Sequence, residues 1–433
     1  MQKKCPEHGE QEVLLASDKD WYESVIRWAH KAGNTFAAAM PSRQGCPHDC
    51  GLCSQHGQGL FLPVIPVTSA CQMKCAICYT HNKNDQPYYM PMEEFRRILK
   101  VIRCADPENR IINFTGGEPT DHPNFLQMIK LCAAEGIHRI TVSTHGLGFL
   151  ENKKLLEELA LYRARVVLSF HSFTKEVWLK MCGSDLLEKK LKILDLLGQY
   201  QLDTTLIPVI NKGINDDELG LFLDCLKKSF VRSLEIHTMA FTGQGGLAFA
   251  GTRTTVPDVI KKLEQLSQGL IKQSDFVPSP LAHPLCYQTC YLMRLDDDHY
   301  IPFTRIMSDE NIRTLLSAGL YMEPGQVMER VMQDVMMDLW SKNLPGDLST
   351  RVLKAVKKLL LDMFPARPIS YAAQQQIAEG AAKTIYIHSH MDDETFDVQR
   401  VRLCPVMVPD GEGHLIPTCS YNVLYRHQDP KFI

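Results

Sequence analysis

The chain has 433 residues, 45% of them hydrophobic and 22% charged, which is the composition of a globular protein with one large domain plus additions or with two to three domains. Its 47 Lys and Arg against 50 Asp and Glu give a formal net charge of −3, so nothing indicates a nucleic-acid partner or an anionic membrane surface. The first residues lack the apolar core of a signal peptide, and no stretch reaches the roughly 18 apolar residues of a spanning helix. We therefore expect a cytoplasmic protein without a transmembrane segment.

Fifteen cysteines in such a chain indicate metal ligation, because a reducing compartment keeps thiols free of disulfides. The first, Cys5, lies in a Cys-Pro-Glu-His-Gly sequence that is similar to the second half of a rubredoxin-like or zinc-ribbon knuckle, whose first half would lie upstream. Three interpretations of Cys5 stay open: a remnant, a ligand to another centre, or an ordinary thiol.

A local motif of three cysteines follows, at Cys46, Cys50 and Cys53. Gly and Pro punctuate it, which favours a tight turn with sulfurs converging on one point, whereas a mobile cysteine-rich surface loop is the alternative. We predict an auxiliary iron–sulfur cluster here, within a cysteine-rich N-terminal segment of residues 1–60.

The same spacing recurs at Cys71, Cys75 and Cys78, directly after an apolar, strand-like run. Three thiolates from one short loop can each bind one iron of a cubane cluster, which leaves the fourth iron open to a small molecule. A zinc site or three unpaired core cysteines are the alternatives, but zinc knuckles usually contribute two cysteines per loop. We interpret this loop as the site of a [4Fe-4S] cluster.

Residues 61–250 alternate short β-rich runs with helical stretches, which predicts a parallel sheet with right-handed crossovers. The predicted strands are Leu62–Val67, Arg110–Phe114, Arg139–Ser143, Val166–Phe170, Asp203–Val209 and Ser233–Met239. The predicted helices between them are Met92–Cys104, Asn124–Glu135, Lys154–Tyr162, Lys175–Met181, Leu186–Tyr200 and Asp216–Lys228. The second strand runs into Gly116, Gly117, Glu118 and Pro119, and the two glycines permit a turn and the close approach of a ligand.

The cysteine loop at Cys71–Cys78, with Tyr79 after it, and the Gly-Gly-Glu-Pro turn about forty residues later together resemble the radical S-adenosylmethionine (SAM) superfamily. The resemblance implies an α/β fold built on a partial (β/α)6 TIM-type barrel, with Cys71, Cys75 and Cys78 as the catalytic cluster ligands. It also implies that Gly116, Gly117, Glu118 and Pro119 bind the methionine end of SAM. Only this cysteine loop is followed by such a turn, which distinguishes it from the earlier one.

Further cofactor contacts are implied by the resemblance at the carboxyl ends of later strands, where barrel enzymes place their ligands. Ser143 and His145 end one strand, and relatives often carry Asn where His145 stands. Ser169 ends the next strand, beside His171, which is either a ligand contact or an exposed histidine. Val209 lies in the region that resembles the adenine-contacting segment.

We predict that residues 251–433 form a C-terminal region that contains helices and an auxiliary cluster. Its cysteines are spread out, at Cys286, Cys290, Cys404 and Cys419; with the three of the N-terminal motif and Cys5 they make eight, enough for two fully ligated cubanes. Helical spacing over Ile312–Gly319, Pro324–Leu339 and Leu348–Met363 includes many methionines, which form either a soft core or a groove for a long substrate. Near the end, two histidines and several carboxylates, His388, His390 and Asp392–Glu394, could bind a metal or form a satisfied polar network.

Taken over nearly the whole chain, these motifs resemble the multi-cluster radical SAM proteins that include archaeal tetraether lipid synthase and proteins labelled dihydropterin methylases. The resemblance implies reductive cleavage of SAM to a 5′-deoxyadenosyl radical, hydrogen abstraction from an unactivated C–H bond, and C–C bond formation or methylation of a lipid or small molecule. The implied cofactors are one catalytic and one or two auxiliary [4Fe-4S] clusters and SAM, with a reductant such as flavodoxin or ferredoxin. A peptide-modifying maturase and a non-catalytic iron–sulfur electron carrier or sensor are the alternatives.

Overall fold

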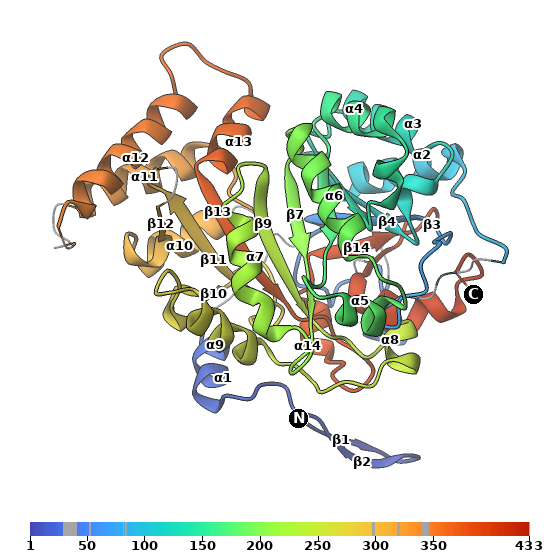
Figure 1. The fold of residues 1–433 in the computed structure, drawn as a ribbon. Helices are drawn as coiled ribbons and strands as arrows, with labels where there is room; N and C mark the ends of the chain where they lie inside the picture. Colours follow the sequence, from blue (N-terminus) through green and yellow to red (C-terminus); the bar gives the residue numbers. More distant parts are fainter. Residues whose placement is uncertain are drawn as a thin grey trace.

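A single 13-stranded sheet organises the protein (Figure 1). The computed structural model describes residues 1–28, 41–51, 53–80, 82, 85–296, 299–317, 321–339, 344 and 346–432. The central strands stand in the order β9-β7-β6-β5-β4-β3, and all neighbours among them are parallel. Their bounds are β3 Leu62–Thr68, β4 Ile111–Gly116, β5 Arg139–Thr144, β6 Arg165–Ser169, β7 Thr204–Ile207 and β9 Val231–Thr238, with the short β8 Val209–Ile210 beside β9.

The crossover helices cover this sheet and bury one apolar face each. They are α2 Met92–Ala105, α3 Phe125–Ala134, α4 Lys153–Leu161, α5 Lys175–Cys182, α6 Leu187–Gln199 and α7 Leu219–Leu226. In α2, for example, Phe95, Ile98 and Ile102 recur at helical spacing and are buried against the sheet. The predicted α/β fold, a partial (β/α)6 barrel, is confirmed.

The C-terminal segment adds strands to both edges of this sheet. On one side β13 Ala382–His388 runs parallel to β9, and β11 Tyr287–Arg294 runs antiparallel to β13. On the other side β14 Val406–Pro409 runs parallel to β3 and pairs with β15 Leu415–Pro417. Tyr287 of β11 packs in one apolar cluster with Val64 of β3 and Val406 of β14, so side chains connect the two edges. The sheet therefore crosses the boundary expected near residue 250.

A group of helices packs beside the barrel around an apolar cluster of its own (Figure 1, orange). The helices are α10 Asp309–Leu316, α11 Gln326–Asp338, α12 Leu348–Met363 and α13 Tyr371–Gly380. Met328 and Met332 are fully buried in this cluster, whereas Met337 is exposed, which is the distribution of a soft methionine core. The helix predicted over Ile312–Gly319 ends at Leu316, and Gly319 lies outside the described residues.

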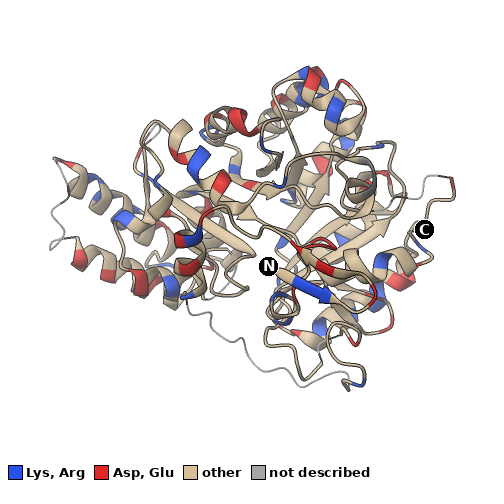
Figure 2. Ribbon diagram, turned by 90° about the horizontal axis from the view of Figure 1, so that it is seen from below, with Lys and Arg blue, Asp and Glu red and all other residues tan. Residues whose placement is uncertain are grey.

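At its N-terminus the chain forms a separate hairpin of β1 Gln2–Cys5 and β2 Gly9–Glu12, followed by α1 Lys19–Ile26 (Figure 1). Acidic and basic residues are interspersed over the helices (Figure 2). Among the helices of the described residues, none combines the length and the apolar character needed to cross a bilayer.

One buried ion-pair cluster joins the C-terminal helices to the barrel. Glu379 of α13 binds both Arg139, the first residue of β5, and Arg165, the first residue of β6. The three side chains are only 11–12% exposed. Although burial opposes its charge, Glu379 holds the pKa of Arg139 above its ordinary value.

We expect Glu379→Gln to lower the free energy of unfolding by about 3–5 kcal/mol, because two buried guanidinium groups lose their counter-charge. Urea unfolding followed by circular dichroism measures the loss. Gln376→Ala is the control on the same helix: its amide oxygen accepts an exposed hydrogen bond from Arg163, so a change within about 0.5 kcal/mol is expected. Equal effects of the two substitutions on the free energy of unfolding would contradict the role of Glu379 as the counter-charge of the two arginines.

Candidate active site

A cavity of about 310 Å³ occupies the inside of the barrel. Its lining includes residues from the amino ends of parallel strands, such as Arg139 and Arg165, and from their carboxyl ends, such as Ser143 and Ser169. The interior of a complete TIM barrel is filled by layers of side chains. Here the lumen is open along the length of the strands, and a ligand can occupy it.

Cys71, Cys75 and Cys78 lie at one end of this cavity, in the loop after β3. The pKa of the Cys71 thiol is raised to about 12, mainly by burial and to a smaller extent by the nearby Glu118 carboxylate and the other two thiols. The pKa of Cys75 is raised by a hydrogen bond with Cys182 and by burial. Three thiolates held so close together in a buried site require a positive charge among them, which a metal cluster provides. The donor set fits a [4Fe-4S] cluster with three protein ligands.

The Gly-Gly turn packs directly against the start of this loop. The backbone N–H of Gly117 donates to the carbonyl of Thr68 (2.7 Å), and that of Glu118 donates to the carbonyl of Ala70 (2.6 Å). A Cβ atom on Gly117 would lie 2.0 Å from the Ala70 oxygen, and Gly116 has a φ of +136°. Glycine is therefore required at both positions to seat the turn beside the cysteine loop.

The Glu118 carboxylate lies behind the turn and is fully buried. It accepts hydrogen bonds from the hydroxyls of Thr120 (2.6 Å) and Thr144 (2.7 Å) and from the backbone N–H of His145 (2.9 Å). Gly116 and Gly117 line the cavity, whereas Pro119 begins the 3-10 turn Pro119–Asp121 and is buried. Glu118 thus ties the turn to the end of β5.

The other predicted cofactor contacts, Ser143, His145, Ser169 and Val209, all line the cavity. Sequence reasoning missed Lys190 of α6, whose ammonium group donates to the carbonyls of His145 (2.7 Å) and Ser169 (2.6 Å) and so connects two strand ends. Burial lowers the pKa of Lys190 to about 8. Sequence reasoning also missed Cys182, which lies beside Cys75 and lines the same cavity. A lysine and a cysteine inside amphipathic helices carry no sequence signal for such roles.

The earlier cysteine motif forms a second, much smaller pocket. Cys46, Cys50 and Cys53 line it together with Arg402, which lies at the end of α14 Val398–Arg402. A hydrogen bond from Cys50 lowers the pKa of Cys46 to about 7, and Arg402 contributes to the shift. The three sulfur-bearing residues therefore converge, as the tight-turn interpretation requires.

The C-terminal cysteines divide into two places. Cys286, Cys404 and Cys419 lie near one another, and the Arg400 guanidinium donates to the Cys286 sulfur (3.3 Å). Burial raises the pKa of Cys419 to about 11. Cys290 is separate: it is buried in the barrel core, and its charged neighbours are Asp275 and Arg305. The structure therefore does not bring Cys290 to the predicted ligand group.

Cys5 lies on the N-terminal hairpin, away from these groups in sequence. Its sulfur is 3.2 Å from Nδ1 of His8, and the contact is exposed. Hydrogen bonds from the backbone of Glu7 and His8 lower the pKa of the Cys5 thiol.

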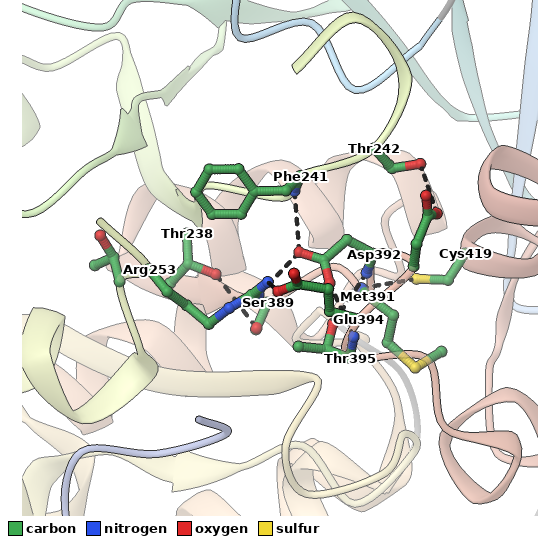
Figure 3. A network of polar contacts seen from close by, with 12 residues as sticks. Thr238, Phe241, Thr242, Arg253, Ser389, Met391, Asp392, Glu394, Thr395 and Cys419 are labelled. Atoms are coloured by element: carbon green, nitrogen blue, oxygen red, sulfur yellow. Dashed lines mark hydrogen bonds and ion pairs between the residues drawn. The ribbon is translucent and has the colours of Figure 1, made fainter. Parts of the chain in front are cut away.

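The acidic residues near the chain end form a polar network (Figure 3). Arg253 binds both Asp392 (2.8 Å) and Glu394 (2.7 Å). The buried Asp392 also accepts hydrogen bonds from the backbone N–H groups of Phe241 (3.0 Å) and Thr395 (2.9 Å). Protein donors therefore supply the hydrogen bonds of these carboxylates. His388 and His390 lie elsewhere and line the cavity together with His237.

A family model and related sequences agree with these observations. Residues 65–226 match the family model described as the radical SAM superfamily. A Methanocaldococcus jannaschii protein named 7,8-dihydro-6-hydroxymethylpterin dimethyltransferase is 26% identical over 99% of this chain and 89% of its own length. A GTP 3′,8-cyclase from Chlorobaculum tepidum is 29% identical over 40% of this chain and 52% of its own length. Among solved structures, Streptococcus suis SuiB bound to the precursor peptide SuiA covers 49% of this chain and 46% of its own, at 18% identity and a TM-score of 0.41.

Proposed function

Because this chain belongs to the radical SAM superfamily and is a radical SAM enzyme, we propose that it methylates a carbon atom of a small, polar ring compound held in the barrel lumen. When bound, the [4Fe-4S] cluster and SAM supply a 5′-deoxyadenosyl radical that removes hydrogen from an unactivated C–H bond. In this proposal Cys71, Cys75 and Cys78 hold the cluster, and Gly116 and Gly117 face the methionine end of SAM. A second SAM would supply the methyl group and leave as S-adenosylhomocysteine. The two electrons that this balance requires, one for each SAM, would come from a reductant such as flavodoxin or ferredoxin.

The charged and polar side chains among the apolar residues that line the lumen carry the proposal. Arg139, Arg165 and Arg232 line the end of the lumen that is formed by the amino ends of the strands. Glu235 lies in the middle of β9, and His237 lies near its carboxyl end. Glu379 already pairs with Arg139 and Arg165, and Asp203 with Arg232. An alkyl chain placed there would remove water from these groups without offering them a further hydrogen bond, which is unfavourable. A flat heterocycle with several donors and acceptors can bond to them instead, with the Tyr287, Tyr321 and Tyr386 rings as apolar surface. A pterin, the substrate in the name of the Methanocaldococcus relative, has this chemistry.

The cover over the cysteine loop supports radical chemistry in the lumen. Helix α8, Gly243–Ala248, lies against the loop, and the backbone N–H of Gly245 donates to the carbonyl of Cys78 (2.7 Å). A Cβ on Gly243 would lie 2.5 Å from the carbonyl carbon of Tyr79, so this helix approaches the loop as closely as glycine allows. Such a cover keeps water and oxygen away from a reactive carbon centre.

We further propose auxiliary clusters at the two other cysteine groups. Cys46, Cys50 and Cys53 supply three ligands of one, and Cys286, Cys404 and Cys419 supply three ligands of the other. Arg402 and Arg400 lie beside these groups and would offset the negative charge of thiolate-ligated clusters.

The test is an anaerobic assay of the reconstituted enzyme with dithionite and SAM carrying an isotope-labelled methyl group. We expect 7,8-dihydro-6-hydroxymethylpterin to raise 5′-deoxyadenosine formation and to gain labelled methyl groups, detected by mass spectrometry. Archaeal lipids and peptides are the parallel substrates. Labelled lipid or a modified peptide, with unchanged pterin, would contradict the proposal, and no 5′-deoxyadenosine with any substrate would favour the electron carrier or sensor.

A further inference from the structure

Three histidines from two neighbouring strands meet in the lumen. His237 on β9 is the register partner of His388 on β13, and the two strands are parallel. His390 follows two residues after His388, and side chains two residues apart along an extended chain point to the same side. All three line the cavity that contains the catalytic cysteine loop.

The rings are close enough to share one ion. Their centroids are 5.2 Å apart for His237 and His388, 5.0 Å for His237 and His390, and 3.9 Å for His388 and His390. One ring nitrogen of each lies within 4.8 Å of the other two. Nitrogens bound to one zinc ion at about 2.1 Å are about 3.4 Å apart, so small side-chain rotations complete the geometry. Among the described residues, no hydrogen bond joins one of these rings to another.

Each ring also has a polar neighbour at one of its nitrogens. The Glu235 carboxylate lies 3.1 Å from Nε2 of His237 and 3.7 Å from Nδ1 of His388. Nδ1 of His390 lies 3.8 Å from the sulfur of Cys419. Tyr287 stacks on His388 (3.8 Å between centroids) and Tyr79 on His390 (5.1 Å), which orients both rings. Histidine ligands of metals are held by such outer contacts, to a carboxylate, a backbone carbonyl or water.

We propose that His237, His388 and His390 bind one zinc-class divalent ion in the lumen, with Glu235 as the outer-shell carboxylate. Imidazole nitrogens suit zinc, and three protein ligands leave a position open to a ligand in the cavity. This step rests on the proposed function: the open coordination position takes an oxygen or nitrogen atom of the ring substrate. Because Tyr79 directly follows Cys78 and stacks on His390, the ion would hold the substrate beside the catalytic loop.

A second group of potential metal ligands lies on the surface. Asp410, Glu412 and His414, around the turn between β14 and β15, also have ligand atoms within 4.8 Å of one another, but Glu412 is exposed. A matched pair of double variants therefore separates the two groups: His237→Ala/His388→Ala for the lumen and Asp410→Asn/His414→Gln for the surface.

The experiment uses the cluster-reconstituted holoenzyme without substrate, so that the cysteines are occupied and the result does not depend on the proposed reaction. The protein is treated with a mild chelator and titrated with Co²⁺. We expect one Co²⁺ per chain, with only nitrogen and oxygen ligands by X-ray absorption, lost in the lumen double variant and kept in the surface double variant. Sulfur ligands, no binding, or loss of binding only in the surface variant would overturn the proposal.

Iron content and thermal unfolding of each variant show whether it folds. Should the lumen double variant lose its iron as well, Glu235→Gln decides the question. It keeps the shape of the side chain and removes the charge on the outer shell, so we expect Co²⁺ affinity to fall about 10–100-fold with the nitrogen ligands retained. Unchanged affinity would overturn the proposal.

Discussion

Cys78→Ala is expected to reduce 5′-deoxyadenosine formation to the level of the protein-free control and to remove the iron of one cluster per chain. The thiol is one of only three in the loop after β3, and a cubane left with two protein ligands is not held. Its sulfur lies 3.2 Å from the Thr80 hydroxyl and 3.5 Å from the Asn82 amide. We expect the protein to fold without these two local hydrogen bonds. Anaerobic iron analysis and chromatography of the SAM cleavage products measure both effects.

Cys182→Ala is the matched control, because Cys182 touches Cys75 and lines the same cavity but lies on α5, outside the motif. It should keep full iron content and SAM cleavage. A triple alanine variant at Cys46, Cys50 and Cys53 should lose a different cluster and still bind SAM. If that triple variant abolished SAM cleavage while Cys78→Ala retained it, the assignment of the two loops would be reversed.

Gly117→Ala is expected to lower the free energy of unfolding by about 3 kcal/mol or more and to weaken SAM binding. The new methyl group would lie 2.0 Å from the Ala70 oxygen, 2.5 Å from the Ala70 carbonyl carbon and 2.9 Å from the Ser69 oxygen. All three are backbone atoms, so no side chain can rotate away. The turn must move off the cysteine loop, which is the surface on which SAM would rest.

Gly380→Ala provides the comparison for this substitution. It is the last residue of α13, and an added Cβ there meets no atom within 4 Å. Alanine should be neutral or stabilising by about 0.4–1 kcal/mol, because it restricts the unfolded chain. Thermal unfolding of both variants and equilibrium dialysis of SAM measure the effects. A Gly117→Ala protein as stable as the wild type, with unchanged SAM binding, would show that the turn does not approach the loop this closely.

Local patterns in the sequence determined the barrel and its catalytic end. The six central strands were predicted within two residues of their starts, because each is a short apolar run between turn residues and is followed by an amphipathic helix. The cysteine loop and the Gly-Gly turn each lie in one short segment, so their chemistry is readable without knowledge of distant neighbours. The N-terminal cysteine motif also lies in one short segment, and its three cysteines line one pocket, but the cluster assigned to them stays a prediction.

Only the tertiary structure decided which distant residues meet. Cys286 and Cys290 have a spacing that converges in a loop, but Cys290 lies within β11, where residues four apart are about 13 Å apart. His237 meets His388 and His390, which lie some 150 residues later, because β13 pairs with β9 in one parallel register. Glu379 reaches the amino ends of the barrel strands because α13 directly precedes β13. Strand pairing depends on packing of the whole chain, and no local period in the sequence encodes it.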